Sequence, residues 1–274
     1  MKHPKPRNAA IDNSRYSSWR ETFAGYRQSV TDGSIDRWLE QFHANDKDVA
    51  ARILDSVDFI SGAQINDSFR QILAGLPGWN IDENQRKGKW RFVPFTSSSG
   101  ESGDSMTHKF RHANGLGSKN YKELFIYRRD LPSQMLTQED TVVFIDDFSG
   151  TGKQVCDYWK ELPELLPEQP TTYLVLVGIN NKARKKIEEE TDLQVVSQFD
   201  FDDTDNLFSD HCTHFSSDEK DKILSYCRKA DRRYPKGSGE CGMVLVFAHN
   251  TPNNSIPILH TNHGAWEGLF KRYD

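Results

Sequence analysis

The sequence predicts an α/β protein in which a doubly wound parallel sheet follows an N-terminal helical region. From about residue 14 to residue 78, apolar residues recur at helical spacing. Further along the chain, short strand-like apolar runs alternate with helical patterns, which is typical of a parallel sheet with crossover helices. The run Tyr173–Ile179 is apolar at every position, as expected for a strand that helices cover on both faces.

Composition narrows the class of protein. The chain has 274 residues, of which 36% are hydrophobic and 27% charged, as in a soluble globular protein of one large or two small domains. A net charge of -5 gives no overall attraction to nucleic acid. No apolar run approaches the ~20 residues of a membrane span, and the basic N-terminus is not followed by the apolar core of a secretory signal. We therefore expect a cytoplasmic protein without membrane contact.

The first part of the chain is expected to be helical. Ile35, Trp38, Leu39 and Phe42 fall at i, i+3, i+4 and i+7, which places them on one face of a helix. The same spacing recurs in two later groups, Val49, Ile53, Leu54 and Val57, and Ile65, Phe69, Ile72, Leu73 and Leu76. We expect residues 1–80 to form an N-terminal helical region and residues 81–274 to form the α/β domain.

Within the α/β domain the expected elements follow from periodicity and from breakers. We expect strands near residues 89–95, 123–127, 141–145, 173–179, 193–199 and 243–247. Helices are expected from about 156 to 166, from 182 to 190 and from 217 to 230. The four cysteines show no paired short spacing, which argues against a zinc ribbon or a disulfide framework.

The most informative stretch begins at the strand near 141–145, which runs directly into Asp146 and Asp147. A turn of mostly small residues follows, Phe148-Ser149-Gly150-Thr151-Gly152, and further along come residues that can carry a helix, Cys156-Asp157-Tyr158-Trp159. Amide groups at the start of a helix lack partners and favour an anion, and the glycines let the backbone approach it. Carboxylates repel phosphate but suit hydroxyl groups or a metal ion. A ligand with a phosphate at one end and a diol beside it would satisfy both halves.

Two other interpretations use the same residues. Gly-Thr-Gly-Lys suggests a nucleotide-binding P-loop, but that motif needs glycine where Asp147 stands and Ser or Thr where Gln154 stands. Alternatively, the segment is a buried strand whose acidic pair caps the next helix.

The stretch resembles the loop that binds phosphoribosyl diphosphate (PRPP) in type I phosphoribosyltransferases. Asp146, Asp147, Thr151 and Gly152 match the acidic pair and the Thr-Gly of that loop, whereas Lys153 and Gln154 depart from its small and hydroxyl residues. The resemblance implies that the acidic pair holds the ribose 2′ and 3′ hydroxyls. It also implies that the amides from Phe148 to Gly152, with Ser149, Thr151 and Lys153, hold the 5′-phosphate, and that Mg²⁺ accompanies PRPP. No residue is assigned directly to the metal.

A second polar loop follows the first expected strand. Its candidate residues for the pyrophosphate group are Ser98, Ser99, Gly100, Glu101 and Ser102, in the loop position that binds pyrophosphate in the phosphoribosyltransferases. Such a run of hydroxyls and glycines is either an anion-binding nest of amides or a plain flexible loop. The nearby basic residues His108, Lys109, Arg111 and His112 either cover the leaving group like a hood or form a solvated connection.

The C-terminal tail adds a further resemblance. The run Asn250-Thr251-Pro252-Asn253-Asn254 and the terminal Trp266, Leu269, Phe270 and Arg272 are similar to a divergent phosphoribosyltransferase-like group of bacterial conflict systems, which includes anti-phage modules and retron-type operons. This resemblance implies a toxin effector in anti-phage defence, with a protein or ribonucleoprotein partner from the same operon.

The sequence therefore supports a phosphoribosyltransferase-like enzyme, a pentosyltransferase, that uses PRPP-Mg²⁺ and an unknown acceptor. The alternative, favoured by Lys153 and Gln154, is an inactive module that senses a nucleotide or PRPP and signals to a partner. A nuclease or other toxin acting on nucleic acid lacks a supporting pattern of carboxylates and lysine on facing strands.

Overall fold

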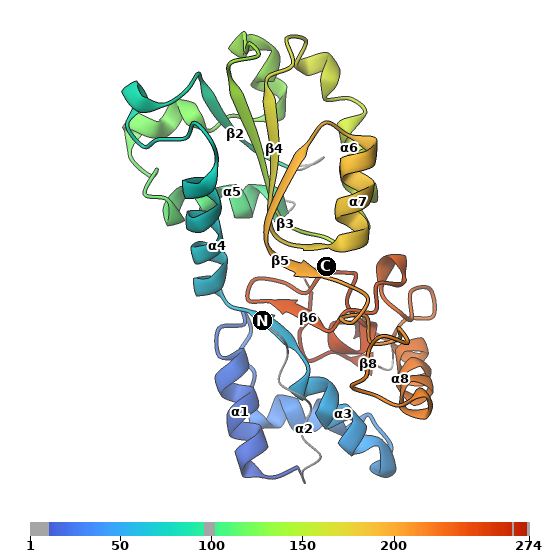
Figure 1. Ribbon diagram of the computed structural model, residues 1–274. Coiled ribbons are helices and arrows are strands. Elements are labelled where there is room, and N and C mark those ends of the chain that lie inside the picture. Colours follow the sequence, from blue (N-terminus) through green and yellow to red (C-terminus); the bar gives the residue numbers. More distant parts are fainter. Residues whose placement is uncertain (1–10, 96–101, 265, 273–274) are drawn as a thin grey trace. The chain divides into compact units, whose positions relative to one another are not determined.

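The computed structural model describes residues 11–95, 102–264 and 266–272 (Figure 1). Over these residues the chain forms two compact units, one from Met1–Gly62 with Asp202–Asp274 and one from Ala63–Phe201. Contacts therefore group the first helices with the C-terminal segment. The division expected between residues 80 and 81 stays a prediction. Each unit has its own hydrophobic core.

The unit Ala63–Phe201 contains a parallel sheet with the strand order β2-β3-β4-β5. The strands are β2 (Trp90–Pro94), β3 (Thr141–Ser149), β4 (Thr171–Asn180) and β5 (Gln194–Phe201). The side chains of β3 and β4 are buried on both faces of the sheet, which is why their sequences are apolar at successive positions. The parallel α/β architecture predicted from the sequence is confirmed.

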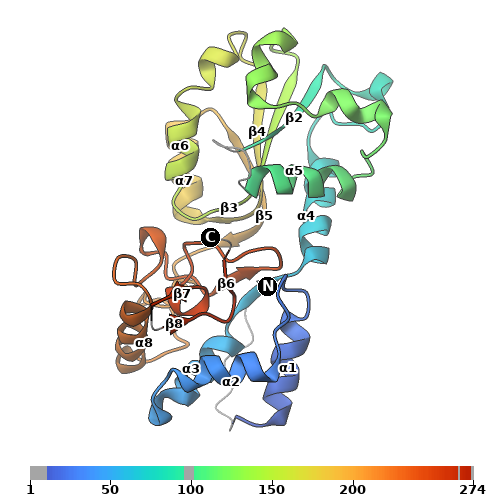
Figure 2. The same cartoon turned by 180° about the vertical axis from the view of Figure 1, so that it is seen from behind.

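Helices cover both faces of this sheet (Figures 1 and 2). One face carries α5 (Ser102–Ala113) and α4 (Gly62–Gly75), and the other carries α6 (Lys153–Trp159) and α7 (Asn181–Glu190). On the first face Phe110 of α5 contacts the rings of both Phe92 and Phe69. On the second face Val155 and Ile187 pack in the same core as β3 and β4. The sheet is therefore doubly wound, as expected.

Two predictions for this unit are wrong, a strand near 123–127 and the end of the helix after β3. The segment near 123–127 is not a strand, because η3 (Lys119–Leu124) and η4 (Arg128–Gln134) flank a single bridge from Phe125 to Phe92. Its apolar pattern is not matched by burial, since Tyr127 is 55% exposed. The helix that begins at Lys153 ends at Trp159 rather than near 166, and Pro163, which has no N–H to continue it, opens the short η5 (Pro163–Leu165). A further short helix, η2 (Glu83–Gln85), precedes β2.

The other unit combines helices from the beginning of the chain with the C-terminal segment. Its helices are α1 (Asn13–Phe23), α2 (Asp32–Glu40), η1 (Ala44–Asp46), α3 (Lys47–Asp55), α8 (Ser217–Ala230), η6 (Ser238–Glu240) and η7 (Pro257–Leu259). Its strands are β1 (Asp58–Ile60), β6 (Leu245–Phe247), β7 (Asn262–His263) and β8 (Trp266–Glu267). The strand expected near 243–247 exists as β6, but it pairs in parallel with β1 and not with the β2-β3-β4-β5 sheet.

The C-terminal tail is built into this unit. Phe270 is fully buried and makes edge contacts with the rings of Phe23 and Tyr26, and the indole N–H of Trp266 donates to the Ile258 carbonyl. The polar run before it is also buried, because Thr251 and Ser255 use their hydroxyls on backbone carbonyls of distant residues. This run therefore has a structural function, which is to satisfy the backbone of the segments it joins.

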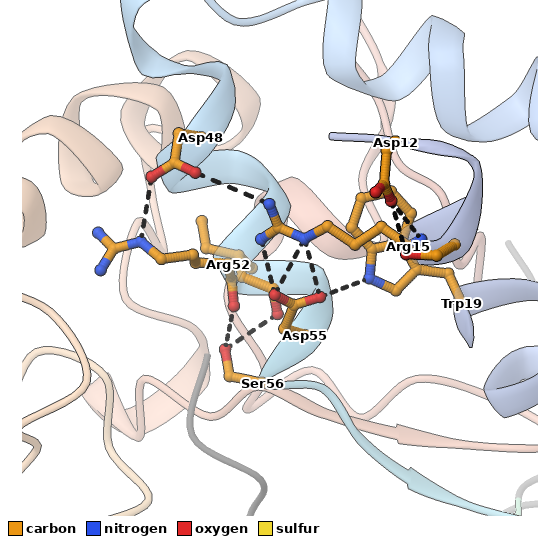
Figure 3. A network of polar contacts seen from close by, with 9 residues as sticks. Asp12, Arg15, Trp19, Asp48, Arg52, Asp55 and Ser56 are labelled. Atoms are coloured by element: carbon orange, nitrogen blue, oxygen red, sulfur yellow. Dashed lines mark hydrogen bonds and ion pairs between the residues drawn. The ribbon is translucent and has the colours of Figure 1, made fainter. Parts of the chain in front are cut away.

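A buried ion-pair network joins α1 to α3 (Figure 3). Arg15 is 2% exposed and donates from Nη2 to Oδ2 of Asp55 at 2.6 Å. The other oxygen of Asp55 accepts from the indole nitrogen of Trp19 at 2.8 Å. Asp48 lies within ion-pair distance of both Arg15 and Arg52, so the guanidinium groups share carboxylates. Burying an arginine is tolerated here because its guanidinium group pairs with two carboxylates and lies over the ring of Trp19.

This network predicts a large stability difference between two aspartates that both pair with α1. Asp55→Ala leaves Arg15 as a buried charge without its main partner, and we expect a loss of about 3 kcal/mol in the free energy of unfolding. Asp32→Ala removes an exposed pair with Arg20 and should cost less than about 1 kcal/mol. Urea titration followed by circular dichroism measures both, and equal losses would contradict the structural role of the buried pair.

Candidate functional site

The candidate site lies at the carboxyl end of β3, where strand order places Asp146 next to Leu176 of β4. The strand continues through Asp147 and Phe148 to Ser149, and the chain then turns through Gly150–Gly152 into α6. In open parallel sheets, ligands bind at this edge because the loops that follow the strands gather there. The expected strand, turn and helix are therefore present in the expected order.

Asp146 is a nearly buried carboxylate, with 8% of its surface exposed. Its Oδ1 accepts a hydrogen bond from the hydroxyl of Ser102, at 2.6 Å, and another from the amide of Asp147, at 2.9 Å. Burial raises the pKa of Asp146 well above its ordinary value, and the negative charge of Asp147 raises the pKa further. The two hydrogen bonds act in the opposite direction, because they favour the ionised form.

The turn after the acidic pair has the close geometry that its glycines suggest. Gly152 adopts a positive φ of 70°, and a Cβ on it would lie 2.9 Å from the carbonyl oxygen of Ala183 in α7. The hydroxyl of Thr151 accepts from the amide of Lys153 at 3.3 Å and so covers the start of α6. Asp146, whose bonds go to Ser102 and Asp147, does not cap α6. The interpretation of the acidic pair as a helix cap is therefore not supported at Asp146.

The side chain of Phe148 packs against another ring of the same unit. Its ring packs edge-on against Phe201, with centroids 6.0 Å apart, over the side-chain-free position of Gly178. A Cβ at Gly178 would lie 3.0 Å from the Phe201 ring. The ring of Phe148 is therefore used in packing, and the contribution of its backbone amide to phosphate binding stays a prediction.

Lys153 does not extend over the turn. Its side chain is 77% exposed and forms an ion pair with Asp157 one turn further along α6, where Lys160 pairs with the same carboxylate. These two lysines, with Lys153 contributing most, lower the pKa of Asp157 to about 2. The charge that the sequence offers to a phosphate is therefore shared with a neighbouring carboxylate.

The second polar loop is only partly described. Ser98, Ser99, Gly100 and Glu101 lie outside the described residues. Ser102 is described as the first residue of α5, and it is next to Asp146. The sequence placed Ser102 with the pyrophosphate loop and missed this contact, for which it carries no local signal.

The basic cluster lies on the helix α5 and is not a solvated connection between elements. Its members are His108, Lys109, Arg111 and His112. Arg111 donates to the carbonyl of Leu116 and covers the ring of Phe125, which commits it to packing. The rings of His108 and His112 lie 4.4 Å apart on the same helix.

A separate polar residue that the sequence did not single out is Asn180. It is buried at the end of β4, and its side-chain oxygen accepts a hydrogen bond from the amide of Lys182.

The described residues offer few ligands for a magnesium ion. Within the described ranges, no group of three or more His, Cys, Asp or Glu side chains could hold a metal ion. Mg²⁺ commonly binds through one or two carboxylates together with substrate phosphates. Asp147, which is less buried than Asp146, is the carboxylate here that could reach an ion brought by a diphosphate.

Burial of Asp146 predicts a stability cost that an amide would remove. We expect Asp146→Asn to raise the free energy of unfolding at neutral pH by about 0.5–2 kcal/mol, because the amide carries no charge and its oxygen can still accept from Ser102. The gain depends on pH. Because the folded pKa of Asp146 is raised, the wild-type protein loses stability as the pH rises from the ordinary value of 3.8 through that folded pKa.

Thermal unfolding of both proteins from about pH 4, near the ordinary pKa of an aspartate, to about pH 8 tests this sign. The two midpoints should converge at the acidic end and separate at the neutral end. A variant that is less stable than the wild type at every pH would show that the ionised carboxylate supports the fold.

Comparison with known proteins identifies the family of the chain. The family model PRTase-CE matches residues 35–272, which covers the sheet, the acidic turn and the C-terminal tail. A comparison with curated proteins gave no match. No helix of the described chain is long and apolar enough to cross a membrane. Because the family model spans most of the sequence, the chain belongs to PRTase-CE, a family of the phosphoribosyltransferase type.

Proposed function

We propose that this protein binds PRPP-Mg²⁺ at the carboxyl end of β3 and transfers its phosphoribosyl group to an acceptor. The observation that carries the proposal is the nearly buried carboxylate of Asp146, followed at once by Asp147 and by a turn of small and hydroxyl residues. A charged group that destabilises the fold at this edge is expected where it serves binding or catalysis. The PRTase-CE match supports the same class of substrate.

In this proposal each half of the site recognises one part of the substrate. Asp146 and Asp147 hold the ribose 2′ and 3′ hydroxyls, because an ionised carboxylate is a strong acceptor of hydrogen bonds from hydroxyl groups. The backbone from Phe148 to Gly152 and the hydroxyls of Ser149 and Thr151 hold the 5′-phosphate. The sequence assigns the pyrophosphate to the polar run that includes residues 98–101.

The chemistry follows from charge. Loss of pyrophosphate leaves positive charge on the sugar ring, and carboxylates fixed beside the ring stabilise that charge as it develops. Magnesium, when bound with the substrate, neutralises the departing diphosphate. By the resemblance of the C-terminal tail, the proposal extends to an effector of anti-phage defence with a protein or ribonucleoprotein partner.

The second candidate function is a sensing module that binds PRPP or a nucleotide without turnover. The ion pair between Lys153 and Asp157 favours it, because a lysine held by a carboxylate contributes less positive charge to the turn. Both functions require the acidic pair, so they differ in the fate of the bound ligand.

Calorimetry with PRPP-Mg²⁺, followed by a pyrophosphate-release assay, tests the proposal. We expect binding by the wild-type protein and a loss of about 100-fold in affinity for Asp146→Asn with Asp147→Asn, since two charge-assisted hydrogen-bond acceptors are removed. The double variant should remain folded. Binding without release of pyrophosphate in the presence of nucleobase, nucleotide and RNA acceptors would favour the sensing module, and absence of binding would exclude both functions.

Lys153 and Lys160 provide a matched pair for the phosphate half of the site. Both pair with Asp157, but only Lys153 is adjacent to the turn. We expect Lys153→Ala to weaken PRPP binding by about 3- to 10-fold and Lys160→Ala to leave it unchanged, because one exposed charge contributes roughly 1 kcal/mol. Calorimetry measures both constants, and equal effects would show that only the overall charge of α6 matters.

A further inference from the structure

The first turn of α5 comes unusually close to the end of β2. A Cβ on Gly103 would lie 2.7 Å from the carbonyl oxygen of Phe95 and 3.0 Å from its amide nitrogen. Real Cβ atoms essentially never come within 3.0 Å of another heavy atom in this way, so this approach depends on glycine at position 103. The turn is therefore held against the sheet by backbone packing.

This packing brings Ser102 to the acidic pair on the neighbouring strand. The hydroxyl of Ser102 donates to Oδ1 of Asp146 at 2.6 Å, which is a short distance typical of a bond to an ionised carboxylate. The amide of Asp147 donates to the same oxygen at 2.9 Å. Two donors from different segments fix both the position and the plane of the carboxylate, because a rotation about its last bond would break them.

We propose that Ser102 is a positioning residue for Asp146 and not a ligand of the pyrophosphate. Oδ2, to which neither donor bonds, is then the oxygen that receives the ribose hydroxyl. This inference rests on the proposed function of the site. It adds a direct link between the segment that follows β2 and the segment that follows β3, so that the sugar-binding carboxylate is set by the element next to the leaving group.

Two simple ligands separate the roles that Ser102 could have. Ribose 5-phosphate contains the diol and the 5′-phosphate but no diphosphate, whereas inorganic pyrophosphate contains neither the diol nor the sugar. A residue that acts through Asp146 changes the affinity for ribose 5-phosphate. A residue that contacts the leaving group changes the affinity for pyrophosphate.

The test is calorimetry of the full chain with each of these ligands in the presence of Mg²⁺. We expect Ser102→Ala to weaken ribose 5-phosphate binding by about 10-fold, the effect of one hydrogen bond to a charged group, with pyrophosphate binding unchanged. Ser102→Thr keeps the hydroxyl and should restore the affinity. Ser105→Ala, on the exposed side of the same helical turn, is the matched control and should change neither ligand.

A double-mutant cycle with Asp146→Ala, which removes the acceptor of the Ser102 hydrogen bond, shows whether the effect passes through Asp146. In that background Ser102→Ala should have little further effect on ribose 5-phosphate. Gly103→Ala, which forces the turn away from Phe95, should reproduce the loss seen in Ser102→Ala.

The possible failures are distinct. Loss of pyrophosphate affinity in Ser102→Ala, or an undiminished loss of ribose 5-phosphate affinity in the Asp146→Ala background, would overturn the positioning role while the proposed function stands. Wild-type protein that binds neither ligand would overturn the proposed function and, with it, this inference.

Discussion

The constraint on which this site depends is the burial of a carboxylate at the end of a parallel strand. Asp146 is almost removed from water, and its charge is opposed by Asp147 beside it. Such a group remains in place only if its surroundings hold it, and here they do so with a hydroxyl from α5 and an amide from its own strand. The burial of α5 on the sheet, the glycine at position 103 and the direction of β3 all serve this arrangement. We therefore expect the buried charge of Asp146 to lower the stability of the fold at the proposed binding site.

The sequence predicted the sheet of the unit Ala63–Phe201 well, because its signals are local. The runs in β3 and β4 are apolar at successive positions, and burial on both faces requires that pattern. It failed at residues 123–127, where the composition suits a strand but Tyr127 is exposed and the chain curls into 3₁₀ turns. The pairing of strands could not be predicted from the sequence either. Nothing local to Leu245–Phe247 shows that its partner is β1, almost two hundred residues earlier along the chain.

The same distinction applies to the site. Asp146, Asp147 and the small-residue turn could be found from the sequence because they are contiguous and follow a strand. The contact of Ser102 with Asp146 could not, because it joins residues that are far apart in the chain and depends on how closely α5 packs. Lys153 and Asp157 are four residues apart, a spacing that allows an ion pair on one face of a helix. The spacing alone does not show whether the lysine side chain pairs along its helix or extends toward a ligand.

The central claim is that Asp146 is held by Ser102 so that it can bind a sugar hydroxyl. A crystal structure of the protein with PRPP and Mg²⁺ tests it most directly. The account predicts a ribose hydroxyl within hydrogen-bond distance of Oδ2 of Asp146, the Ser102 hydroxyl still on Oδ1, and the 5′-phosphate against the backbone of Ser149–Gly152. Ser102 bound to the diphosphate, or a sugar placed away from the acidic pair, would contradict it.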